Sequence, residues 1–135
     1  MTRFHRLLTP RRDEVFATLE ELSAFLDGCV LPPRTRNAVE VASEELLSNV
    51  WKYAYPQGEA GEAEVVLEAG PDVVRLEVSD GGRPFDPTLV PPPPPPSLDS
   101  EPGGRGIHLV RSLSGSFSYR REGSRNVVIV EFPVS

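Results

Sequence analysis

The sequence has one cysteine among its 135 residues, no long apolar run and fewer basic than acidic residues. Because Cys29 stands alone, a disulfide framework within the chain and a multi-cysteine metal cluster are both excluded, which indicates a reducing compartment. No stretch approaches the roughly 20 apolar residues of a membrane span. The first residues also lack the apolar core of a targeting signal. We therefore expect a soluble, cytoplasmic protein without a membrane partner.

The charge balance argues against nucleic acid as the main partner. The 14 Lys and Arg residues face 20 Asp and Glu residues, which gives a net charge of −6 and a pI of about 4.9. Phosphate backbones need a basic surface, which this composition does not supply. The length fits a single compact domain over residues 1–135 that can bury a core of its own.

Proline is the one residue type in clear excess. The chain has 15 prolines, against a usual share of about 5%. Nine of the 15 lie between Pro84 and Pro102, and six of these form an unbroken run over residues 91–96. Outside this window the composition is that of an ordinary globular protein. The excess is therefore a local feature of a folded domain and does not indicate general disorder.

Hydrophobic periodicity predicts three helices and about five strands. Helices are expected over residues 13–27, 34–54 and 107–113, and strands over 4–8, 63–67, 74–78, 117–121 and 127–132. The first helix is expected to bury Val15, Phe16, Leu19, Leu22 and Leu26. The second is expected to bury Val39, Ala42, Leu46, Val50 and Tyr53.

Turn residues join the later strands into hairpins. They occur at residues 70–72 (Gly-Pro-Asp) and 122–124 (Glu-Gly-Ser). Hairpins pair strands antiparallel, so the sheet should be mixed or mainly antiparallel, with the helices on one face. We therefore predict the α+β class, as a two-layer α/β sandwich.

Three groups of residues are candidates for a site, and each also has an ordinary structural explanation. Glu45 and Asn49 lie one helical turn apart, about 40° around the axis, where they either face a cleft or form an exposed edge. Asp80-Gly81-Gly82 follows a core strand and is either a ligand contact or a common turn. Gly103-Gly104-Arg105-Gly106 opens the last helix and is either an anion cradle or a hinge.

The order of the three groups is more specific than any one of them. Glu-x-x-x-Asn on a helix, Asp-x-Gly after a strand and Gly-x-Gly opening a helix resemble the ATP-binding boxes of the Bergerat-fold (GHKL, HATPase_c) superfamily. Residues 43–49 (Ser-Glu-Glu-Leu-Leu-Ser-Asn), followed by Tyr53-Ala54-Tyr55, are most similar to the anti-sigma factor serine kinases (RsbW-like). The resemblance extends over nearly the whole chain.

The resemblance implies a role for each matching residue. Glu45 would be the general base, Asn49 would ligate Mg²⁺, and Asp80 would bind the adenine amino group, with Gly82 making room for the ring. Gly104, Arg105 and Gly106 would hold the phosphates of ATP. The implied partners are a sigma factor and an anti-anti-sigma (STAS-domain) substrate. Relatives of this kind are often dimers, although no feature of this sequence indicates a dimer face.

The sequence departs from the family pattern at several positions. Tyr53 stands where many relatives have His, and residues 124–127 (Ser-Arg-Asn-Val) lack the threonine that often supports the adenine site. The proline run falls in the loop over residues 86–103, which corresponds to the ATP lid. It is either a stiff spacer, which we favour, or a docking segment. Near the last hairpin, Arg120, Arg121 and Arg125 are expected to form a solvated basic patch.

Two functions follow from the resemblance. The first is an ATP-dependent protein serine/threonine kinase that also acts as an anti-sigma factor. The alternative is a nucleotide-dependent binding module without kinase activity, since the proline-rich lid differs from that of the relatives. The Glu45/Asn49 pair favours the kinase.

Overall fold

The computed structural model describes residues 2–55, 61–89 and 105–134. Most of the expected lid loop, including its proline run and Gly104, lies outside the described residues.

The described chain forms one five-stranded sheet in the order β1-β2-β3-β5-β4, and every pair of neighbouring strands is antiparallel. The predicted α+β sandwich is therefore confirmed, with the sheet wholly antiparallel among the described strands. The strands are β1 (Thr2–Leu8), β2 (Ala63–Ala69), β3 (Val73–Asp80), β4 (Ser116–Glu122) and β5 (Arg125–Pro133). At the β4–β5 turn, Gly123 has a φ of 61°, a left-handed conformation that glycine adopts without strain.

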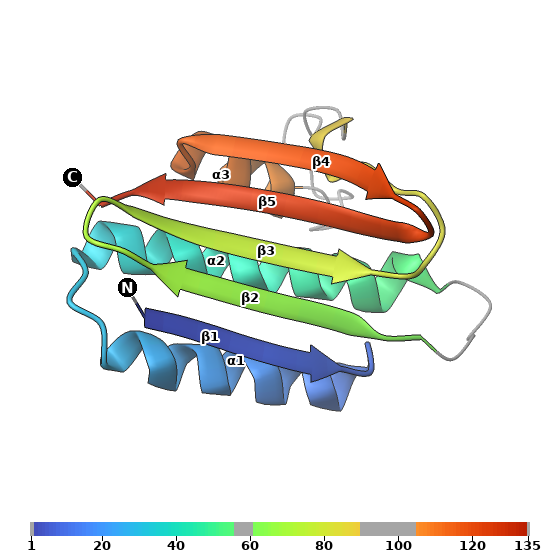
Figure 1. Ribbon diagram of the computed structural model, residues 1–135, viewed down its shortest axis with the longest axis horizontal. Coiled ribbons are helices and arrows are strands. Elements are labelled where there is room, and N and C mark those ends of the chain that lie inside the picture. The colour runs from blue at the N-terminus through green and yellow to red at the C-terminus, as the bar shows by residue number, and fades with distance from the viewer. Residues whose placement is uncertain (1, 56–60, 90–104, 135) are drawn as a thin grey trace, which may run out of the picture.

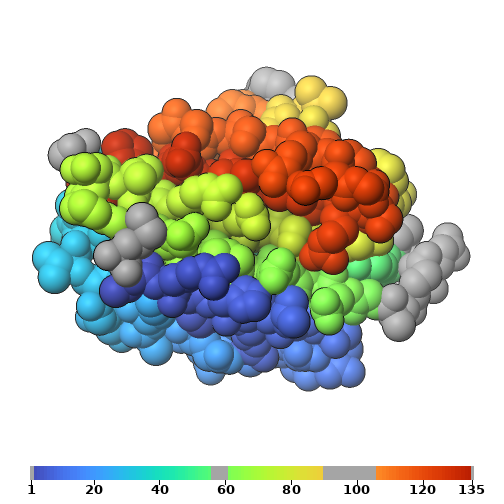
Figure 2. All heavy atoms as spheres, in the orientation of Figure 1, coloured from blue at the N-terminus to red at the C-terminus, as the bar shows by residue number. Residues whose placement is uncertain are grey.

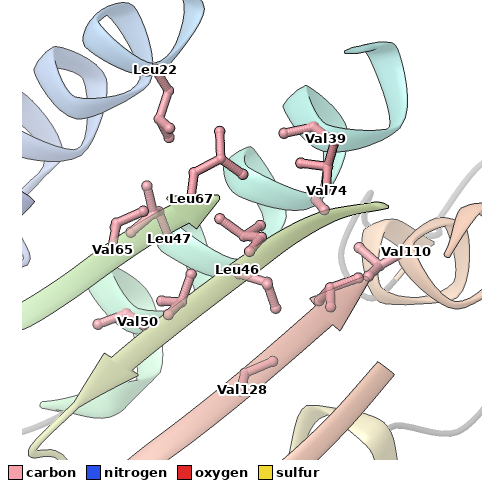
Figure 3. Packing of buried hydrophobic residues seen from close by; sticks show 14 of the residues in the cluster. Leu22, Val39, Leu46, Leu47, Val50, Val65, Leu67, Val74, Val110 and Val128 are labelled. Atoms are coloured by element: carbon pink, nitrogen blue, oxygen red, sulfur yellow. The ribbon is translucent and has the colours of Figure 1, made fainter. Parts of the chain in front are cut away.

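Three helices cover one face of the sheet, as predicted (Figure 1). They are α1 (Arg12–Asp27), α2 (Pro33–Asn49) and α3 (Arg105–Leu113). Helix α2 lies between the other two and packs on β3 and β5. Its side chains Leu46, Leu47 and Val50 point at the strands, among Val65, Leu67 and Val128 (Figure 3).

Two residues of the predicted core are exposed. Phe16 is 48% exposed on α1, where Arg12 stacks over its ring, and Tyr53 is 43% exposed. The other four members of the second predicted stripe are buried. Tyr53 leaves this stripe because the α-helix ends at Asn49 and continues as a π-helix, η1 (Val50–Ala54). The wider π turn changes the direction of every later side chain, so α-helical spacing fails there.

No described helix covers the other face of the sheet, which faces the viewer in Figure 2. This face carries paired charges. Arg75 lies between Glu68 and Glu77, at N–O distances of 3.6 and 3.3 Å, and His5 contacts Glu64 at 2.6 Å. No described helix is long and apolar enough to cross a membrane.

Of the three arginines predicted to form a solvated basic patch near the last hairpin, Arg120 and Arg121 are exposed and Arg125 is half-buried, and each has a polar partner. Arg120 is paired with Glu122 at 2.7 Å, and Arg125 donates to the Ser79 hydroxyl at 3.0 Å. Arg121 donates to the Gly82 carbonyl at 2.9 Å, so this arginine belongs to the turn after β3.

Candidate functional site

Asp80 is the last residue of β3 and is buried, with 6% of its surface exposed. Its Oδ1 accepts hydrogen bonds from the Gly82 amide at 2.8 Å and from Asn126 Nδ2 at 3.0 Å. Among the described residues, no donor reaches Oδ2. The two described hydrogen bonds of the Asp80 carboxylate therefore both fall on Oδ1.

Asp80 lines a largely apolar pocket between α2 and the sheet. Its cavity volume is only about 30 Å³, so a planar ring would also need the open space at its mouth. The lining residues are Leu46, Asn49, Val50, Ala54, Val78, Asp80, Phe85, Pro87, Asn126 and Val128.

Asn49 and Asp80, two of the residues expected in the site, therefore line the same pocket. The apolar walls suit the faces of a heterocyclic base, and a carboxylate suits an amino donor at its edge. Asn49, at the end of α2, supplies a neutral oxygen of the type that Mg²⁺ accepts. No group of three or more acidic, His or Cys side chains in the described part of the chain could hold a metal.

Gly82 has a different role from the one expected for it. It is buried, and a Cβ atom placed on it would lie 2.7 Å from the Cβ of Ala54 and would overlap the Ala54 carbonyl. The next residue is bound to the same segment, because the Arg83 amide donates to the Ala54 carbonyl at 3.1 Å. Gly82 therefore makes room for the end of η1, and it is not among the residues that line the pocket.

Glu45 lies one turn before Asn49 and is half-buried, whereas the neighbouring Glu44 is exposed. Burial raises the pKa of the Glu45 carboxyl from its ordinary value of 4.5, although the positive charge of Lys52 lowers it and the negative charge of Glu44 raises it further. Gly106, in the first turn of α3, lies directly against this carboxylate, since an added Cβ would overlap it. Arg105 is the first residue of α3.

Two parts of the site could not be identified from sequence patterns. The Tyr55 hydroxyl, just beyond η1, accepts from the Gly81 amide at 3.0 Å and so holds the turn after Asp80. Asn126, on β5 opposite Asp80, binds the Asp80 side chain itself. The only signal for Asn126 in the sequence was its place in the segment where the threonine of the related proteins was missing.

Comparison with known proteins agrees with this geometry. Residues 8–132 match the family described as histidine kinase-like ATPase domain. The serine/threonine-protein kinase BtrW of Bordetella bronchiseptica is 32% identical over 95 residues, which cover 69% of this chain and 67% of that protein.

Solved structures share the fold. The chain with the RsbU and RsbW domains of Rv1364c from Mycobacterium tuberculosis aligns with a TM-score of 0.70 at 14% identity, over 98% of this chain and 32% of that one. A blue-light activated histidine kinase of Erythrobacter litoralis aligns with a TM-score of 0.58 at 18% identity, over 89% of this chain and 41% of that one. The chain thus spans less than half of either structure.

The neighbouring glycines of the Asp80 turn provide a matched test of the packing. We expect Gly82→Ala to lower the free energy of unfolding by about 1–3 kcal/mol, because the new methyl group overlaps the Ala54 backbone. In Gly81→Ala the new methyl meets only the Tyr55 hydroxyl at 3.5 Å, so the change should stay within about 1 kcal/mol. Urea unfolding of both variants measures the difference. Equal stability of the two would contradict the close contact.

The raised pKa of Glu45 predicts a pH-dependent stability difference. Because the folded pKa lies above the unfolded value, the contribution of Glu45 to stability is present below pH 4.5 and is lost as the pH rises through the folded pKa. Glu45→Gln should therefore gain stability relative to wild type between pH 4 and pH 7. Denaturant unfolding at each pH tests this, and a difference that is constant with pH would refute the shift.

Proposed function

Because this chain belongs to the histidine kinase-like ATPase family, as an RsbW-like member of the GHKL group, we propose that it is an anti-sigma regulatory factor that phosphorylates serine or threonine on an anti-anti-sigma (STAS-domain) partner. The observation that carries the proposal is the pocket that joins Asp80 to Asn49. Adenine would lie between its apolar walls, with the amino group donating to Asp80 Oδ2.

The phosphates would then extend from the pocket towards Glu45 and the start of α3. Asn49 would supply its oxygen to Mg²⁺, which when bound would offset the negative charge of the phosphates. The backbone at Arg105 and Gly106 begins a helix, whose positive end favours anions. The family resemblance also implies phosphate contacts for Gly104 and Arg105, but Gly104 and the Arg105 side chain lie outside the described part of the structure.

Glu45 would act as the general base of the transfer. Its carboxylate takes the proton of the partner's hydroxyl while that oxygen bonds to the γ-phosphorus and the bond from phosphorus to the bridging oxygen of ADP breaks. A pKa raised by burial makes the carboxylate a better proton acceptor. The kinase name of the Bordetella relative supports this reading.

Calorimetric titration with ATP, with and without Mg²⁺, tests the binding step. Asp80→Asn should weaken ATP binding at least tenfold, because a hydrogen bond to a charged group contributes about 1.5–3 kcal/mol. Asn49→Ala should lose most of the affinity that Mg²⁺ adds. Asn37→Ala, at an exposed position of the same helix, should bind as wild type does. Undiminished affinity in Asp80→Asn would rule out the proposed adenine contact.

Phosphotransfer needs a separate measurement with labelled Mg-ATP and a candidate STAS-domain protein. Wild type should produce phosphoserine or phosphothreonine on that protein. Glu45→Gln should reduce the transfer rate by at least 100-fold while ATP binding is retained. Glu44→Gln, which removes the exposed neighbouring carboxylate, should retain transfer. Transfer that persists in Glu45→Gln would contradict its role as base, and ATP binding without transfer to any partner would favour the regulatory module without kinase activity.

A further inference from the structure

Asn126 lies on β5 directly opposite Asp80, and its side chain is almost completely buried, at 3% exposed. Its Nδ2 donates to Asp80 Oδ1 at 3.0 Å and to the Arg83 carbonyl at 2.8 Å. A side-chain amide carries two N–H bonds, so both are used.

The amide oxygen of Asn126 is engaged as fully as its nitrogen. Oδ1 accepts from the Tyr119 hydroxyl at 2.6 Å, the Arg121 guanidinium at 3.1 Å and the Phe85 amide at 3.2 Å. Three donors exceed the two lone pairs of a carbonyl oxygen. Asn126 therefore has no hydrogen-bonding capacity left for a ligand, although it lines the pocket.

These contacts join three separate elements. Asp80 ends β3, Arg83 and Phe85 form the segment that follows it, and Tyr119 and Arg121 come from β4. Arg121 also holds the Gly82 carbonyl at 2.9 Å. The buried side-chain amide of Asn126 thus holds both Asp80 and the segment that carries Phe85. Both of these residues line the pocket.

We propose that Asn126 is a positioning residue for base recognition: by donating to Asp80 Oδ1 it fixes the direction of the Asp80 carboxylate, and it holds the 83–85 segment in place at the pocket wall. The inference rests on the proposed function, because it takes adenine as the occupant. It specifies how selectivity for the amino group arises. A carboxylate free to rotate would lose the fixed direction of its acceptor, and a preorganised acceptor discriminates better than a mobile one.

The substitution that tests this role is Asn126→Asp, which keeps the shape and the acceptor oxygen but replaces the Nδ2 donor with an oxygen. That oxygen faces Asp80 Oδ1 and the Arg83 carbonyl, so the contacts that hold Asp80 become repulsive. Asn37→Asp is the matched control, since it makes the same change at an exposed position of α2.

The measurement is calorimetric binding of two nucleotides, ATP and purine riboside triphosphate, which lacks the amino group. We expect wild type and Asn37→Asp to prefer ATP by at least tenfold, and Asn126→Asp to prefer it by less than threefold. Loss of general packing would weaken both nucleotides equally and leave the ratio unchanged. An unchanged ratio in Asn126→Asp would therefore overturn the inference.

The remaining outcomes are also decisive. If the wild-type protein binds neither nucleotide, both the proposed function and the inference are refuted. If the wild-type protein prefers ATP and Asn126→Asp prefers it to the same degree, the inference alone is refuted. If Asn126→Asp does not fold, Tyr119→Phe replaces it, because it removes only one donor to Asn126 from a half-buried ring. A drop of twofold or more in the ATP preference supports the positioning role, and no change overturns it.

Discussion

The apolar contact between α2 and the middle of the sheet keeps the two halves of the candidate site together. Glu45 and Asn49 belong to the helix, whereas Asp80 and Asn126 belong to strands β3 and β5. The helix and the sheet meet through fully buried side chains such as Leu47 of α2 and Leu67 of β2, which are 0% exposed. Burial of apolar surface is not directional, but close packing in a core permits few relative positions of helix and sheet. The core therefore fixes distances between polar groups that do not touch each other.

Close contacts and hydrogen bonds then fix the end of the pocket at Asp80, where the chain leaves regular strand and α-helix geometry. The π-helix η1 ends at Ala54, which packs against Gly82. Tyr55 follows, and its hydroxyl accepts a hydrogen bond from the Gly81 amide. From the opposite side, the β4–β5 hairpin holds Asp80 through Asn126. π-Helical segments occur frequently at functional sites, because they place side chains where a regular helix would not.

Local sequence patterns were sufficient to predict the helices and strands of the fold and the proximity of Glu45 and Asn49 on α2. Glu45 and Asn49 could be placed together because four residues make about one helical turn, and Asp80 because a strand ended there. Asn126 could not be paired with Asp80, since the contact spans 46 residues and depends on the register of β3 with β5. The packing of Gly82 against Ala54 could not be predicted either, because it depends on the π-helical geometry of η1, which α-helical spacing does not predict.

The strand order also has a consequence for biosynthesis. β5 follows the other described elements in the chain but lies inside the sheet, between β3 and β4. Until the ribosome has released residues 125–133, β3 has an unpaired edge and Asp80 has no cross-strand partner. Domains fold as cooperative units, and unpaired strand edges favour misassembly. The nascent protein therefore completes the pocket around Asp80 in the same late step that pairs the edge of β3.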